Sequence, residues 1–207
     1  MNTHSSTGHR RTKHLLTSLV LVAITLAPSI ARANGAPALL DDFSDTTRSS
    51  IGIDRVVVTD SSTGGTSKLR QTFANGVLTA EGEIVPGRGQ PGWVSLVLLL
   101  SSGGTPLDLS RYEGIRLRVR VRKGMLSLTA NSTEIKNFDF HASLIPRKGD
   151  EFHEVRVPFG DMKRAWSEQT PLNPATIASI SLVAVDLQKG AFAYDIDEIG
   201  FYPSSNK

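Results

Sequence analysis

Residues 114–122 alternate strictly between apolar and charged side chains, and no other feature of the sequence constrains the fold as tightly. The segment reads Gly-Ile-Arg-Leu-Arg-Val-Arg-Val-Arg. Successive side chains of a strand point to opposite faces, so an extended strand places the four apolar residues on one face and the four arginines on the other. Such a strand covers a core with one face and meets solvent with the other, as in antiparallel sheets.

Similar short segments fill the rest of the chain. They predict strands over residues 39–43, 55–59, 67–73, 77–84, 93–100, 138–145, 153–159, 177–186 and 191–202. Asn75-Gly76 is a strong hairpin signal between two of them. About ten short strands without a long helix are typical of an all-β sandwich, a fold that more often binds a ligand than catalyses a reaction. We expect a single sandwich domain over residues 39–203.

The first 33 residues have the layout of a secretory signal peptide. A basic segment, residues 10–13, precedes an apolar stretch over residues 15–27, and Ala31-Arg32-Ala33 is a cleavage signature. As a helix, the apolar stretch would span ~20 Å, less than the ~30 Å of a bilayer core. A mitochondrial transit peptide is the alternative, but the stretch is apolar all round rather than amphipathic. We therefore expect periplasmic or secreted localisation after cleavage behind Ala33, without an integral membrane segment in the mature chain.

Removal of this leader changes the charge of the protein. Four of the 23 basic residues and none of the 20 acidic ones lie in the leader, so the remaining chain has 19 basic and 20 acidic residues. A nearly neutral domain gives no electrostatic case for nucleic acid as a partner. The absence of cysteine excludes disulfides and thiolate chemistry. After the leader we expect a short linker, residues 34–38, then the sandwich, and a tail of residues 204–207.

Groups suited to catalysis are sparse. His141 and His153 are the only histidines beyond the leader, and there is no Gly-x-Ser-x-Gly motif. Asp139 and His141 alternate on the strand face opposite Phe138, where they are candidates for an acid/base pair or part of a metal site. Polar outer faces are common in sheets, so a solvated pair is the preferred interpretation. We expect no enzyme activity.

Several motifs occur in the same order as in a known family, and the chain resembles the complex I intermediate-associated protein family. They are Leu40-Asp41-Asp42-Phe43, Gly64-Gly65-Thr66-Ser67, Gly76-Val77-Leu78 leading to Gly92-Trp93, the block from Leu107 to Val119 (Leu-Asp-Leu-Ser-Arg-Tyr-Glu-Gly-Ile-Arg-Leu-Arg-Val), Glu154-Val155-Arg156-Val157-Pro158-Phe159 and Asp195-Ile196-Asp197-Glu198-Ile199. The resemblance implies a galactose-binding-like jelly-roll β-sandwich, related in architecture to many carbohydrate-binding modules.

This resemblance leads to three expectations about function. The first is a non-catalytic, exported binding protein or assembly-factor-like protein that acts on a protein partner. The alternative is a module that recognises a glycan, as carbohydrate-binding modules do. A glycan-active enzyme with paired carboxylates is the second and least favoured alternative.

The resemblance also implies a structural calcium ion, the only cofactor considered, because in such modules an ion often ties the first strand to the last. Asp42 and Asp45 near the start and Asp197 near the end are the candidate ligands, since calcium takes oxygen ligands. Capping interactions or pairing with arginine are the preferred alternative for these acids.

The arginine row is the sharpest predicted surface feature. At ~3.3 Å per residue, neighbouring guanidinium groups on this face are about 6.6 Å apart. They suit either an anionic or hydroxylated ligand or acids on adjacent strands, such as Glu81, Glu83 and Glu154, and the near-neutral charge favours the acids. For a ligand docking on a sheet face, the predicted contacts are Arg118, Arg120 and His141, with Trp166 at the rim.

Overall fold

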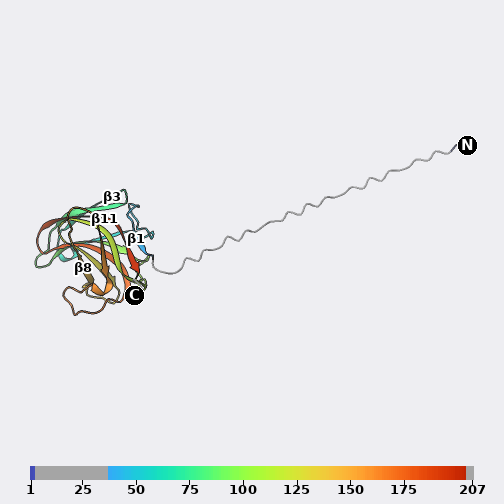
Figure 1. Ribbon diagram of the computed structural model, residues 1–207. Coiled ribbons are helices and arrows are strands. Elements are labelled where there is room, and N and C mark those ends of the chain that lie inside the picture. Colours follow the sequence, from blue (N-terminus) through green and yellow to red (C-terminus); the bar gives the residue numbers. More distant parts are fainter. Residues whose placement is uncertain (3–36, 204–207) are drawn as a thin grey trace. The chain divides into compact units, whose positions relative to one another are not determined.

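The computed structural model describes residues 1–2 and 37–203. The predicted signal peptide, most of the predicted linker and the predicted tail lie outside the described residues. Within the unit formed by residues 34–207, the described chain consists of eleven strands and three short 3-10 helices (Figure 1). No helix in this described part has the length and hydrophobicity needed to cross a membrane.

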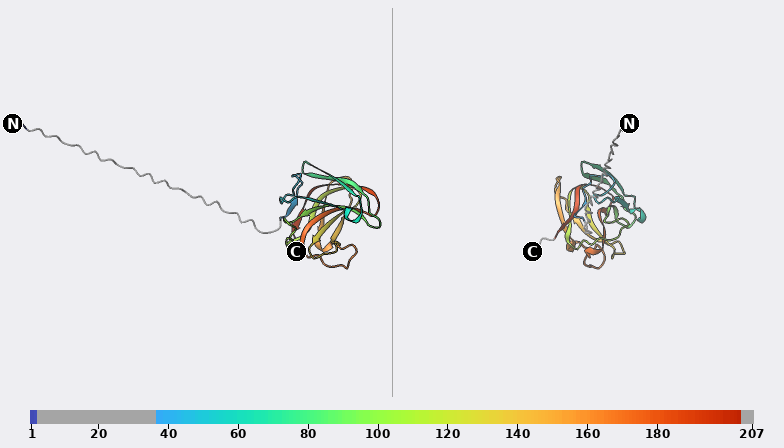
Figure 2. Two further views of the ribbon diagram at one scale, coloured as in Figure 1. Left: turned by 180° about the vertical axis from the view of Figure 1, so that it is seen from behind. Right: turned by 90° about the vertical axis from the view of Figure 1, so that its right-hand side faces the viewer.

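Two antiparallel sheets form a sandwich, which confirms the predicted all-β, galactose-binding-like fold class (Figure 2). The six-stranded sheet has the order β3-β4-β11-β6-β9, with β1 paired to β11. Its strands are β1 (Leu39–Asp41), β3 (Lys68–Ala74), β4 (Val77–Ile84), β6 (Tyr112–Lys123), β9 (His153–Pro158) and β11 (Gly190–Pro203). The five-stranded sheet has the order β2-β5-β10-β7-β8. Its strands are β2 (Val56–Thr59), β5 (Gly92–Leu99), β7 (Leu126–Ser132), β8 (His141–Ile145) and β10 (Ile177–Asp186).

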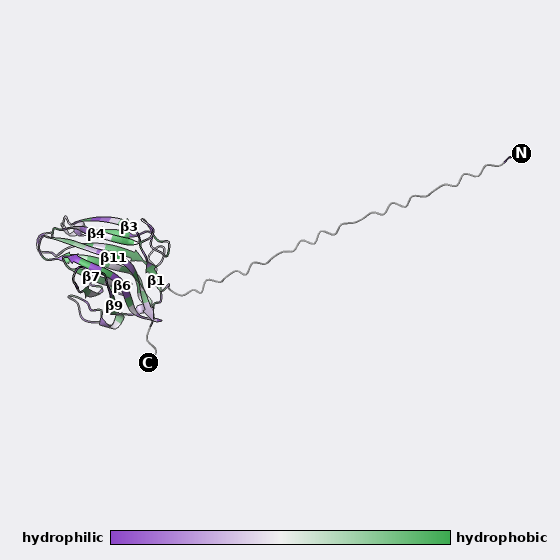
Figure 3. Ribbon diagram, turned by 45° about the horizontal axis from the view of Figure 1, so that its top comes forward, coloured by the Kyte–Doolittle hydropathy of each residue, from purple (hydrophilic) through white to green (hydrophobic). Residues whose placement is uncertain are grey.

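One core fills the space between the sheets. On β6, Ile115, Leu117, Val119 and Val121 are at most 1% exposed, and they pack in the same cluster as the inward residues of β5, β7 and β10. The alternation of apolar and polar residues along the strands is visible in Figure 3. Without disulfides, this continuous apolar core is the main source of stability, at ~25 cal/mol for each Å² of apolar surface buried.

The prediction was wrong in two places. β7 was not predicted, because Ala130 and Asn131, whose residue types are depleted in strands, interrupt the alternation that begins with the inward Leu126 and Leu128. The strand predicted over residues 138–145 begins only at His141, since Phe138 has a φ of 63° that interrupts the extended backbone.

Candidate functional site: the charge-free face and the aromatic edge

The outer face of the six-stranded sheet carries a ladder of ion pairs. Each arginine of the row on β6 meets an acidic residue of β11: Arg116 pairs with Glu198, Arg118 with Asp197, and Arg120 and Arg122 both with Asp195. The Nε atoms of Arg120 and Arg122 lie 2.9 and 2.8 Å from Asp195 Oδ2. The row therefore pairs with acids on a neighbouring strand, although the main partners are on β11 rather than at Glu83 or Glu154.

Asp195 is the buried centre of this ladder. Burial alone would raise the pKa of its carboxyl, but hydrogen bonds from Thr79 and the two guanidinium groups outweigh it, so the pKa lies below the usual value. Arg118 and Arg120 also lie over the ring of Phe152, with 5.1 and 4.8 Å between guanidinium carbon and ring centroid. Because the arginines interact with acids and an aromatic ring of the same domain, the ladder stabilises the fold.

The predicted cluster of Arg118, Arg120, His141 and Trp166 does not share one sheet face. Both arginines belong to β6, whereas His141 begins β8, which pairs with β7 in the other sheet. A strand's place in a sheet order follows from long-range pairing, which alternation along the sequence does not reveal. The structure does bring His141 and the chain around Trp166 together, because His141 Nε2 lies 2.7 Å from the carbonyl oxygen of Thr170.

The three predicted calcium ligands do not form a ligand set. Asp42 accepts hydrogen bonds from the hydroxyls of Ser44 and Ser50, Asp45 caps its own loop, and Asp197 pairs with Arg118. Backbone N–H groups of Arg48 and Thr47 lower the Asp45 pKa to about 2. Within residues 37–203 no three acidic or histidine side chains lie close enough together to hold a metal ion.

The five-stranded sheet presents a very different outer face. Its five strands contain one carboxylate or cationic residue, Asp186, at the very end of β10. The side chains that alternate with the core residues are small hydroxyl and amide groups between aliphatic ones. We call this surface the charge-free face; its polar members are Ser95, Ser127, Thr129, Asn131, Ser179 and Ser181, and its apolar members are Val56, Val58, Trp93, Val97, Leu99, Val183, Val185 and Leu144.

The centre of the charge-free face is low and polar. Its five hydroxyl residues are at most 9% exposed. Asn131 Nδ2 donates to Ser179 Oγ at 2.8 Å and to Ser181 Oγ at 2.7 Å, which links β7 to β10. Trp93, half-buried on β5, stands opposite Val185 at one end. A surface with neutral hydrogen-bonding groups and an indole suits an uncharged, hydroxylated ligand.

Two large aromatic side chains stand in the solvent at the β8 border of this sheet. Phe138 is 79% and Trp166 is 72% exposed. Phe138 precedes β8, and the segment around Trp166 follows Lys163, which exchanges two backbone hydrogen bonds of 2.9 Å with Ala142 of β8. We call residues 137–140 and 164–170 together the aromatic edge.

Asp139 holds the two halves of the aromatic edge together. Its carboxylate is 1% exposed and accepts hydrogen bonds from the backbone N–H groups of Ala165, Trp166 and Ser167, at 2.8, 3.1 and 2.6 Å. Burial alone would raise the pKa of this carboxyl, but the hydrogen bonds from Ser167 and its neighbours outweigh it, so the pKa lies below the usual value. The predicted solvated pair was thus wrong, because both Asp139 and His141 are buried.

Further contacts fix the same two segments. The guanidinium of Arg164 donates to the Asp139 backbone oxygen and to Asn137 Oδ1, each at 3.1 Å. His141, 2% exposed, has its Nε2 at 2.7 Å from the Thr170 carbonyl oxygen. The aromatic edge is therefore a preorganised surface rather than a loose loop. Sequence reasoning missed its role because its key signal, a buried carboxylate that binds backbone N–H groups 26 to 28 residues away, is a long-range contact.

The comparison with family models decides the classification. The model for complex I intermediate-associated protein 30 matches residues 44–196. The chain belongs to this family. Among curated protein sequences, none matches the chain significantly.

Solved structures show the same fold at low sequence identity. A family 11 carbohydrate-binding module of a cellulosomal cellulase from Clostridium thermocellum is 15% identical, with a TM-score of 0.57 over 82% of this chain and 95% of that one. A family 11 module from the same organism in complex with a β-1,3-1,4-mixed-linked tetrasaccharide is 14% identical, with a TM-score of 0.56 over 82% and 97%. An agarase is 10% identical, with a TM-score of 0.55 over 82% of this chain and 26% of the agarase. These likenesses concern the fold.

Proposed function

We propose that this protein is a non-catalytic binding domain that holds a neutral glycan chain on the charge-free face, with Phe138 and Trp166 as stacking groups at the border. The observation that carries the proposal is the aromatic edge. The two backbone segments that carry the exposed rings are held together by a buried carboxylate and a half-buried arginine. Exposed aromatic groups that sit on a rigid backbone bind with little loss of conformational entropy.

The chemistry of the charge-free face supports the same ligand class. A neutral sugar offers hydroxyl groups to short hydrogen-bonding side chains and an apolar C–H face to aromatic rings. The buried positions of Asp139 and His141 leave neither as a free acid or base for a substrate, which supports a non-catalytic role. A neighbour of the same fold is recorded with a mixed-linked tetrasaccharide, and this makes that sugar a suitable first probe.

We also propose that the protein acts after export. The proposal is supported by the first 33 residues, in which a basic segment is followed by an apolar stretch and then by the Ala-x-Ala cleavage signature. A glycan ligand is compatible with a periplasmic or extracellular location, where polysaccharides are accessible.

Affinity electrophoresis in gels containing neutral polysaccharides tests the ligand class. Mixed-linked β-glucan and agarose are the first probes, and the wild-type chain should be retarded by at least one of them. Trp166→Ala and Phe138→Ala should each weaken the affinity measured by retardation about fivefold, because stacking of an aromatic group contributes about 1 kcal/mol. Leu187→Ala is the matched control, since Leu187 is 77% exposed outside the site. Equal loss in the control, or no effect of either aromatic variant, would contradict the proposal.

A second candidate function, binding of a protein partner in the manner of an assembly factor, rests on β2. This strand lies at the edge of the five-stranded sheet, and its valines at 56, 57 and 58 are 39–45% exposed. Exposed apolar edge strands are sites where another chain can add a strand. A photo-crosslinking residue at Val57, used in the native host, should yield one defined protein adduct for this function. If no adduct forms at Val57, protein docking at β2 is refuted.

A further inference from the structure

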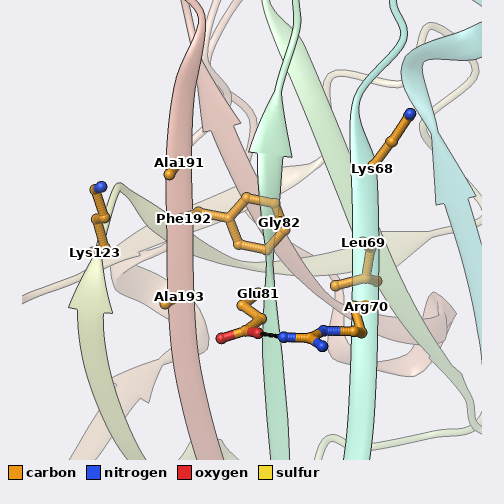
Figure 4. Close-up of a pocket in the computed structure, with 9 residues that line it drawn as sticks. All are labelled: Lys68, Leu69, Arg70, Glu81, Gly82, Lys123, Ala191, Phe192 and Ala193. Carbon is orange, nitrogen blue, oxygen red and sulfur yellow. Dashed lines mark hydrogen bonds and ion pairs between the residues drawn. The ribbon is translucent and has the colours of Figure 1, made fainter.

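The six-stranded sheet has a shallow hollow of about 580 Å³ on its outer face, next to the Arg122 end of the ion-pair ladder. It spans β3, β4, β11 and β6 (Figure 4). Ala191 and Ala193 of the central strand β11 form its floor, while the flanking strands carry the long side chains of Lys68, Arg70 and Lys123. Its volume falls in the range of ~300–1,000 Å³ that is typical of small-ligand sites.

The charges around the hollow are not balanced. Its lining has three cationic residues and one acid, Glu81, which pairs with Arg70 and whose Oε2 lies 4.0 Å from Arg122 Nη2. A second acid, Glu83, stands opposite Lys68 in the pairing of β3 with β4, but its ion pair is with Lys189. Within residues 37–203, neither Lys68 nor Lys123 has an acidic partner within 4 Å. The rest of this sheet face pairs its arginines with acids, whereas these two lysines, on opposite sides of the alanine floor, make no ion pair with the described residues (Figure 4).

We propose that this hollow binds an anionic substituent, a carboxylate or a sulfate ester, carried on a polysaccharide. Ammonium groups of lysine are compact donors to oxyanions, and both lysines project from regular strands, which limits the cost of positioning them. The alanine floor leaves room for the apolar face of a sugar ring beside the anionic group. A domain with near-neutral charge lacks the extended basic surface that nucleic acid requires.

This site is independent of the neutral-glycan site, because it lies on the other sheet. It goes beyond the proposed function by giving the protein a second surface with the opposite preference. A protein with both sites would bind neutral stretches of a polysaccharide on the charge-free face and acidic stretches in the hollow of the six-stranded sheet.

Affinity electrophoresis with dextran sulfate, polygalacturonate and unmodified dextran tests the inference, and the first two separate the sulfate from the carboxylate source. The wild-type chain should be retarded more strongly by at least one anionic polymer than by dextran. Lys68→Gln with Lys123→Gln should weaken this binding at least tenfold, since each lysine supplies a charged hydrogen bond. A higher salt concentration should weaken binding of the anionic polymer more for the wild type than for the Lys68/Lys123 variant.

The matched control removes two charges elsewhere, by Arg147→Gln with Lys148→Gln in the exposed loop before β9. This control should bind as the wild type does. The inference is overturned if neither anionic polymer binds, if the Lys68/Lys123 variant binds unchanged, or if the loop control loses as much affinity.

Discussion

Replacing Asp139 by asparagine keeps the shape of the side chain and removes the charge that holds the aromatic edge. Three backbone N–H groups point at the carboxylate, and Arg164 Nε lies 3.9 Å from Asp139 Oδ2. The amide of asparagine turns an NH2 group toward some of these donors, so at least one backbone N–H loses its acceptor. A buried donor without a partner costs about 1–3 kcal/mol, and a buried charge pair that loses one member costs about 3–5 kcal/mol.

We therefore expect Asp139→Asn to lower the free energy of unfolding by about 3 kcal/mol at pH 7. For a domain of this size that corresponds to a fall in Tm of roughly 10 °C. Urea unfolding followed by circular dichroism measures the change, with Asp150→Asn in an exposed loop as the control. The aromatic variants of the binding test keep this anchor, so they should melt as the wild type does.

The pH dependence gives a second check on the same residue. The pKa of Asp139 is lower in the folded protein than the ~3.9 of an unfolded aspartate. Its contribution is thus complete above about pH 5 and is lost as the pH falls through 4 toward the folded-state pKa. The stability difference between wild type and Asp139→Asn should shrink over this range. A difference below 1 kcal/mol at pH 7, or one that does not change down to pH 3, would refute the reasoning.

Three further predictions concern the scaffold and the N-terminus. The double variant Arg118→Gln with Arg120→Gln should lower the Tm by several degrees and leave neutral-glycan binding unchanged, because both arginines pair with acids of β11. Loss of glycan binding at an unchanged Tm would show instead that the binding site lies on the arginine row of β6. The Tm measured with calcium and the Tm measured with a chelator should be equal, because Asp42, Asp45 and Asp197 already make hydrogen bonds or an ion pair within the protein. Values several degrees apart would show that these acids bind the ion instead. Intact-mass analysis of protein from the native host should show a chain that begins at Asn34; retention of residues 1–33 would contradict export.

The fold could be predicted from the sequence because strand alternation is a local signal. The arginines and apolar residues of β6 occupy the faces that their period of two requires. The strand β7 escaped prediction because alanine and asparagine, which are depleted in strands, weaken the pattern that its two leucines begin, and the tertiary contacts of an interior strand compensate for this weak preference.

The site was less accessible to sequence reasoning, because it depends on which strands become neighbours. Trp166 was expected to be exposed at a rim, and it is 72% exposed. Asp139 and His141 were expected to be solvated, yet the segment containing Trp166 folds over them from 27 to 29 residues further along the chain. The arginines drew attention as donors, but their acids lie more than 70 residues away on β11. The charge-free face consists of unremarkable serines and valines that only the sheet order brings together.

Chemical-shift mapping with the β-1,3-1,4-mixed-linked tetrasaccharide tests the central claim most directly, because it shows where a neutral glycan binds as well as whether it does. A titration followed by amide and indole NMR signals should move resonances of the charge-free face, above all Thr129, Asn131 and Ser181, together with the indole N–H of Trp166. Resonances of the β6 arginine row should stay in place. Shifts confined to the six-stranded sheet, with the charge-free face and Trp166 unmoved, would contradict the account.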